Sequence, residues 1–104
     1  MRRKNYYSVS DAISDLQARG FSIDFNLIDD KLFCVQEQCY LGAEDFEVLE
    51  MHRFYAIGAT CNETVVYGIE AISRALRGIL LNSCNHSLAQ VPPILYGKIR
   101  KFWV

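Results

Sequence analysis

The sequence lacks any run that approaches the roughly 18 consecutive apolar residues of a membrane-spanning helix. It has only two prolines, six glycines that stand singly, and no internal repeat or low-complexity segment. The basic residues at positions 2–4 are not followed by an apolar segment, so we expect no secretory signal. These absences predict a cytoplasmic protein without a transmembrane segment.

The short motifs of several enzyme classes are also missing. There is no G-x-x-x-x-G-K-[ST] phosphate loop, no G-x-G-x-x-G dinucleotide turn, no G-x-S-x-G nucleophile elbow and no H-E-x-x-H zinc pair. Each of these motifs positions a nucleophile, a metal ion or a phosphate in an active site. Their absence therefore argues against an enzyme of these classes. No cofactor is predicted.

The composition does provide enough apolar material for a folded core. Of the 104 residues, 51% are hydrophobic and 22% are charged, which excludes a wholly disordered chain. A chain of this length suits one compact domain, so we expect a single domain over residues 1–104.

The formal net charge of −1 is unevenly distributed. Six of the eleven basic residues lie at positions 2–4 and 98–101, and the segment between them holds all twelve acidic residues. An acidic body repels phosphate backbones, so we do not expect nucleic-acid binding. From Lys98 to Trp103, basic residues alternate with apolar and aromatic ones, a pattern that also fits contact of this tail with a membrane surface.

The clearest local signal is an N-terminal helix over residues 9–19. Ser8 is typical of a helix N-cap, Asp11 of the first helical turn, and Gly20 of the position that ends a helix. Between them, apolar residues recur every three or four positions: Val9, Ala12, Ile13 and Leu16.

Alternation of apolar and polar residues predicts strands in the middle of the chain. The alternating segments and short apolar runs are 21–27, 31–35, 46–57, 65–69 and 79–81. Asp29 and Asp30 predict a hairpin turn, and residues 36–43 a loop. Residues 71–77 fit a strand, a turn or a helix.

A second helix is expected near the C-terminus. Pro92 and Pro93 suit a first helical turn, and Leu95, Ile99 and Phe102 follow at helical spacing. The order of helix, strands and helix predicts an α+β fold. We expect a two-layer arrangement with an antiparallel sheet of about four to five strands.

The predicted strand at 46–57 is apolar on both faces. Strict alternation places on one face the apolar Phe46, Val48, Phe54 and Ala56 and the polar Glu50 and His52. A strand with two apolar faces is either central in its sheet or contacts a partner, because edges and apolar patches favour pairing. We therefore expect a homo-oligomer, with a homodimer formed through a sheet edge or an apolar strand face.

Glu50 and His52 are the candidate catalytic residues, because they are neighbours on one strand face. A carboxylate beside an imidazole can orient it as a general base. Arg53 is a third candidate, but it points to the opposite face of the strand. The alternative is a polar pair at a sheet edge or an interface, and the sequence does not tell whether Glu50 and His52 line a pocket.

Cysteines supply the candidate metal ligands. Four S or N ligands form a structural zinc site, and the residues that come nearest to such spacing are Cys34, Cys39, Cys84 and His86. The C-x4-C spacing lies at the edge of the usual range and the C-x-H spacing is strained. The alternative is that these cysteines are reduced and packed as small apolar residues.

Segments around residues 19–27, 46–54 and 65–69 carry a family resemblance. Arg19-Gly20-Phe21, Phe46-Glu47-Val48 and Val65-Val66-Tyr67-Gly68-Ile69 resemble a family of small uncharacterised bacterial proteins that are often labelled phosphoribosylpyrophosphate synthetase. That label implies binding of a phosphorylated sugar. Synthetases of that name follow an acidic segment with a Thr- and Gly-rich phosphate loop, whereas here Lys31-Leu32-Phe33-Cys34 follows Asp29-Asp30, so no catalytic residue is transferred.

Two functional hypotheses follow. The first is a non-enzymatic binding or protein-interaction module. The alternative is a small enzyme or regulator that binds a phosphorylated metabolite through Glu50, His52 or Arg53. The sequence favours the interaction module.

Overall fold

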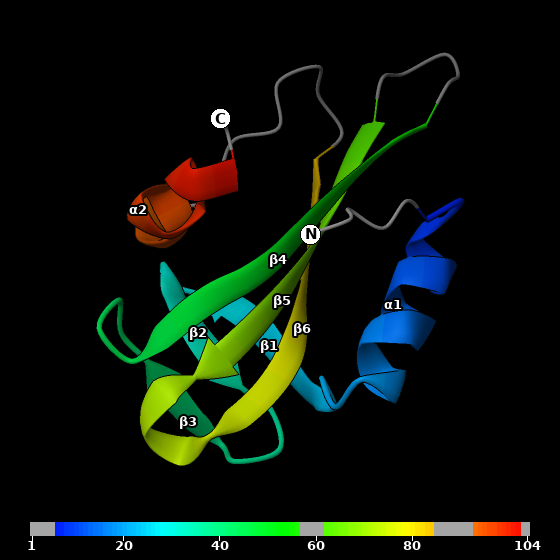
Figure 1. Ribbon diagram of the computed structural model, residues 1–104. Coiled ribbons are helices and arrows are strands. Elements are labelled where there is room, and N and C mark those ends of the chain that lie inside the picture. The colour runs from blue at the N-terminus through cyan, green and yellow to red at the C-terminus, as the bar shows by residue number, and fades with distance from the viewer. Residues whose placement is uncertain (1–5, 57–61, 85–92, 103–104) are drawn as a thin grey trace.

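The fold combines two helices with one six-stranded sheet (Figure 1). The computed structural model describes residues 6–56, 62–84 and 93–102. In chain order the elements are α1 (Val9–Ala18), β1 (Ile23–Ile28), β2 (Lys31–Cys34), β3 (Cys39–Leu41), β4 (Phe46–Ala56), β5 (Asn62–Ala71), the 3-10 turn η1 (Ile72–Arg74), β6 (Leu76–Cys84), the 3-10 turn η2 (Pro93–Leu95), α2 (Tyr96–Ile99) and the 3-10 turn η3 (Arg100–Phe102).

The strand order in the sheet is β3-β2-β1-β6-β5-β4. All neighbouring strands pair antiparallel except β1 and β6, which are parallel. The predicted α+β class and both terminal helices are confirmed. The expected antiparallel sheet of four to five strands is only roughly right, because the sheet is mixed and has six strands. The alternation of residues within β1 does not indicate which strand pairs with it. Its parallel partner, β6, lies about 50 residues later in the chain.

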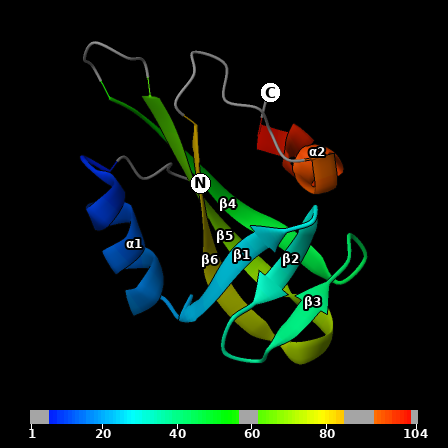
Figure 2. The same cartoon turned by 180° about the vertical axis from the view of Figure 1, so that it is seen from behind.

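The two helices lie on opposite faces of the sheet, as Figures 1 and 2 show from two sides. Under α1, a small apolar cluster contains Ala12, Leu16, Phe21, Val66 and Ile79. The larger core on the other face includes Leu95 and Ile99, next to and within α2. The expected two-layer arrangement is therefore wrong. Helix, sheet and helix form three layers, since both faces of the central strands carry buried apolar residues.

The sheet is curved around the larger core. This core joins residues of the β2 and β3 end with residues of the β4 end: Leu32, Leu41, Phe46 and Val48. Gly78 of β6 permits β1 to lie very close to it. A Cβ atom at this position would lie 2.2 Å from the carbonyl oxygen of Ile23 in β1 and 2.7 Å from the Phe25 ring.

Local turns explain where the predicted strand boundaries hold and where they fail. Asp29 and Asp30 both have positive φ, as the central residues of a type I′ hairpin turn require. The expected loop at 36–43 instead contains β3, which is only three residues long and so has no measurable alternation. Within 71–77, the chain forms η1 and then a left-handed Ala75 (φ 53°), which together connect β5 to β6.

A β-bulge in β4 changes which of its side chains share a face. Val48 pairs with Ile69 but Glu50 pairs with Gly68, so Leu49 is an extra residue on β4. Phe46 and Val48 consequently face the α2 side, whereas Glu50 and His52 face α1. Strict alternation, which placed these four residues on one face, is therefore wrong at this point.

The helices themselves follow their local signals. The Ser8 hydroxyl accepts a hydrogen bond from the Asp11 N–H at 3.2 Å, and Gly20 follows the helix with φ 101°. Near the C-terminus, Leu95 and Ile99 are fully buried and Phe102 packs against the same core. Nowhere in the described chain is a helix both long and apolar enough to cross a bilayer.

Candidate functional site

The predicted pair Glu50 and His52 lies under helix α1, beside a place where the helix is packed closely on the sheet. Gly68 of β5, opposite Glu50, makes this approach possible. A Cβ atom at Gly68 would lie 3.1 Å from the Phe21 ring and 3.3 Å from Leu16. The end of α1, with Arg19, is thereby held over the β4 bulge that turns Glu50 toward it.

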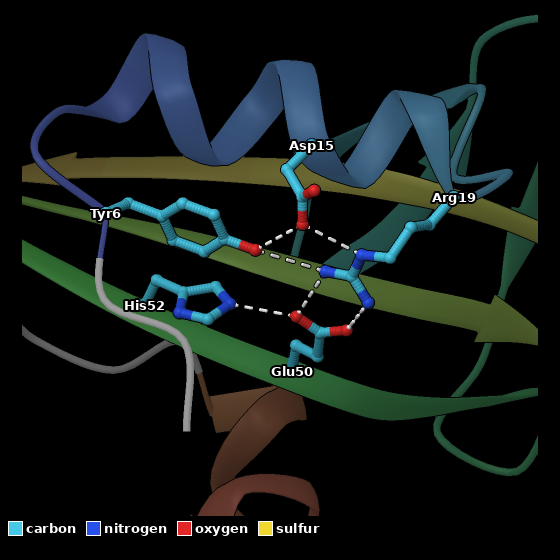
Figure 3. A network of polar contacts seen from close by, with 5 residues as sticks. All are labelled: Tyr6, Asp15, Arg19, Glu50 and His52. Carbon is cyan, nitrogen blue, oxygen red and sulfur yellow. Dashed lines mark hydrogen bonds and ion pairs between the residues drawn. The ribbon is translucent and has the colours of Figure 1, made fainter. Parts of the chain in front are cut away.

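Five side chains form one polar network in this place: Tyr6, Asp15, Arg19, Glu50 and His52 (Figure 3). The Arg19 guanidinium donates two hydrogen bonds to the Glu50 carboxylate, from Nη1 to Oε2 and from Nη2 to Oε1, the latter at 2.8 Å. His52 Nε2 lies 2.9 Å from Glu50 Oε1. Because an ionised carboxylate only accepts, the imidazole N–H donates in this contact.

The other half of the polar network fixes Arg19 from the helix side. Arg19 Nε donates to Asp15 Oδ2 at 2.9 Å, one helical turn earlier, and Nη2 donates to the Tyr6 hydroxyl at 3.2 Å. The Tyr6 hydroxyl in turn donates to Asp15. The Tyr6 ring contacts the His52 ring edge to face, with centroids 4.8 Å apart, and so closes a ring of contacts.

The electrostatics favour the charged forms of Arg19 and Glu50. The hydrogen bonds from Arg19 lower the pKa of Glu50, and they outweigh the desolvation that would raise it. The same bonds raise the pKa of Arg19. Burial, followed by the hydrogen bond to Asp15, raises the pKa of Tyr6, so the phenol stays neutral near pH 7.

This arrangement is suited to holding α1 on the sheet. Both oxygens of Glu50 accept hydrogen bonds from Arg19, and Oε1 also accepts one from His52, so this carboxylate is fully used in contacts within the protein. The side chains of Glu50 and His52 are 25% and 15% exposed and lie in direct contact at 2.9 Å. The geometry is that of a clamp between α1 and β4.

The remaining candidate catalytic residue does not join this group. Arg53 pairs with Val65, a residue of the larger core, so it lies on the sheet face opposite Glu50. Sequence reasoning missed Arg19, Asp15 and Tyr6 as partners. Only the spacing of Asp15 and Arg19, one helical turn apart, signalled a local pair; the link to Glu50 spans 31 residues.

The four candidate metal ligands are only partly described. Cys34 and Cys39 face each other across the β2–β3 hairpin and both are free thiols. Cys84 ends β6, and His86 lies outside the described residues. Within residues 6–56, 62–84 and 93–102, no three His, Cys, Asp or Glu side chains gather as a metal site.

No protein-family model matches the chain, and no curated protein or solved structure is significantly similar to it. The family resemblance in the sequence therefore transfers no site residue. The geometry of the described residues alone supports a functional proposal.

Proposed function

We propose that this protein is a non-enzymatic interaction module that forms a homodimer through the outer edge of β4. One observation carries the proposal. β4 is eleven residues long, lies last in the strand order, and pairs with β5 on one side, with no described strand on the other. An edge of this length presents a row of backbone donors and acceptors to another strand.

The opposite edge of the sheet provides the contrast. β3 is three residues long, which is one of the ways in which proteins prevent edge pairing. On β4, α2 contacts the first part of the strand, where Lys98 Nζ lies 2.9 Å from Glu47 and 5.3 Å from the centre of the Phe46 ring. The strand continues for nine residues beyond Glu47.

Side chains beside this edge also favour a partner. Leu49, Met51 and Phe54 are apolar and only partly buried, and they contribute to both sheet faces. A second strand against β4 would cover part of each. Because strand pairing buries a small area, we expect a dissociation constant in the micromolar range or weaker.

Sedimentation velocity over a concentration series, combined with hydrogen exchange, tests this proposal. We expect a reversible monomer–dimer equilibrium, and slower exchange of outward-facing β4 amides at high than at low protein concentration. The amides of β3 serve as the internal control and should exchange at the same rate throughout. A strict monomer at the highest soluble concentration would refute the dimer.

A matched pair of lysine substitutions locates the interface. Met51 lies in the middle of β4, so in a two-fold antiparallel pair Met51→Lys brings like charges close together and should weaken the dimer roughly tenfold. Tyr40→Lys places the same charge on β3 and should leave the dimer unchanged. Equal weakening by both variants would place the interface elsewhere, and circular dichroism establishes that each variant is folded.

A further inference from the structure

Cys34 and Cys39 lie directly opposite each other at the end of β2 and the start of β3. Figure 2 shows these two strands of the sheet. Opposed residues of antiparallel strands have Cα atoms about 4.5 or 5.5 Å apart, depending on the type of pair. A disulfide needs a Cα separation of about 4.4–6.8 Å. Both pair types therefore fall within reach of a disulfide between Cys34 and Cys39.

The turn between the cysteines is held in place by hydrogen bonds to Asp24 of β1 and by one within the turn itself. Gln36 accepts a hydrogen bond from the Asp24 backbone N–H at 2.9 Å and donates one to the Asp24 carboxylate at 3.0 Å. The Val35 N–H donates to the Asp24 carbonyl at 3.0 Å, and the Gln38 side chain donates to the Val35 carbonyl at 2.9 Å. The opposition of the two thiols is thus built into the fold.

The two thiols differ in access to solvent. Cys34 is only 1% exposed and belongs to the larger core, whereas Cys39 is partly exposed. Burial raises the pKa of Cys34, so the fraction of this thiol in the reactive thiolate form is smaller than for an ordinary cysteine. Because Cys39 is the more accessible of the two thiols, we expect it to react first with an external reagent.

We propose that Cys34 and Cys39 form a dithiol–disulfide site that exchanges with low-molecular-weight disulfides, with Cys39 as the attacking thiol and Cys34 as the resolving thiol. The Cys39 thiolate attacks one sulfur of oxidised glutathione, which releases one glutathione and leaves a mixed disulfide. Cys34 then loses its proton to water, and its sulfur attacks Cys39 Sγ, which breaks the mixed disulfide and releases the second glutathione. In total, two protein thiols are oxidised and one glutathione disulfide is reduced to two thiols.

This site is independent of the proposed dimer. β3 and β4 are the two opposite edges of the sheet, so oxidation links the short edge and leaves the long one unchanged. We therefore expect the same monomer–dimer equilibrium for the reduced and the oxidised protein. The dimer and the dithiol site are therefore tested by separate experiments, and failure of one does not refute the other.

Peptide mapping after equilibration with oxidised and reduced glutathione tests the site. Trypsin yields residues 32–53 as one peptide that contains both cysteines, and an internal disulfide lowers its mass by two hydrogen atoms. Cleavage after Glu37, which lies between the cysteines, should leave two fragments joined until a reductant is added. A link from Cys39 to any cysteine other than Cys34 would overturn the proposal.

Two matched variants test the assigned order. In Cys34→Ala, Cys39 should accumulate as the glutathione mixed disulfide, because the resolving thiol is gone. In Cys39→Ala, Cys34 should react with glutathione at least about tenfold more slowly, because it is buried. Equal labelling of both variants would contradict the order, and an unmodified chain that stops at the mixed disulfide would contradict the site.

The same equilibration in urea shows whether the fold brings the thiols together. We expect the internal disulfide to be favoured at least about tenfold more in the native protein than in the unfolded chain, since the held turn removes the cost of loop closure. An equal or smaller equilibrium constant in the native protein would show that the fold does not preorganise the pair.

Discussion

The two faces of the sheet hold their helices by different means. On one face, α1 covers a small apolar cluster and is tied to β4 by the polar network around Arg19. On the other face, Leu95 and Ile99 are fully buried in the larger core, and Lys98 of α2 forms an ion pair with Glu47 of the sheet. Apolar packing supplies stability on the α2 face, whereas directional hydrogen bonds supply orientation on the α1 face.

The largest effects on stability are expected at two glycines, one on each face of the sheet, where neighbouring atoms lie very close to the backbone. For Gly78→Ala, on the α2 face, we expect a loss of more than about 3 kcal/mol in the free energy of unfolding, since the new Cβ meets a backbone oxygen that cannot move aside. For Gly68→Ala, under α1, we expect about 1 kcal/mol, because its neighbours are side chains. Urea unfolding measures both.

Gly97→Ala in α2 is the matched control, because nothing lies within 4 Å of the point where its Cβ would stand. It should be neutral or slightly stabilising, as alanine restricts the unfolded chain. A loss at Gly68 as large as that at Gly78 would mean that α1 is packed as rigidly as the curved core.

Removal of charges should affect the α1 face more than the α2 face. We expect Glu50→Gln to cost about 1–2 kcal/mol, since it leaves the partly buried Arg19 guanidinium with only one of its two carboxylate partners, Asp15. A double-mutant cycle with Arg19→Met should give a coupling energy of about 1 kcal/mol. Lys98→Met, on the α2 face, should cost less than about 1 kcal/mol, because Glu47 is 44% exposed. A larger effect at Lys98 would reverse the comparison.

Acid should remove the contribution of Glu50. The pKa of Glu50 is lowered in the fold, so its ion pair adds stability above the ordinary value of 4.5, and this contribution is lost as the pH falls through the lowered pKa. The difference in unfolding free energy between the unmodified protein and Glu50→Gln should therefore be largest near pH 7 and shrink as the pH falls below 4.5. A difference that stays constant with pH would show that the carboxylate charge is not the source.

The smallest effect is expected from ligands. Because the polar network is internally satisfied, thermal-shift assays against nucleotides and sugar phosphates should give no stabilisation. If a sugar phosphate raises the melting temperature and Glu50→Gln abolishes that rise, the polar network binds a ligand. That result would favour the alternative function, a metabolite-binding regulator, over a purely structural role of the network. The Arg53→Gln variant is the control, since Arg53 lies on the other face.

The sequence identifies two residues of the polar network but not how the network is arranged. Glu50 and His52 were identified as neighbours from their spacing, and they are in contact. Their grouping with Phe46 and Val48 failed because one inserted residue, Leu49, reverses the alternation of a strand. Bulges leave no periodic signal, so neither the turn of Glu50 toward α1 nor its pairing with Arg19 followed from spacing.

Short-range patterns in the sequence are enough to predict the helix ends and the hairpin turn of this protein. The Ser8 cap, the Gly20 stop, the Asp29-Asp30 turn and the apolar stripe of Leu95 and Ile99 each act over a few residues, so they can be identified without knowledge of the rest of the chain. Only the tertiary structure shows the parallel β1–β6 pairing and the close approach of the β1 backbone to Gly78. These depend on which distant segments gain most by packing together, and that balance is a property of the whole sheet rather than of any segment.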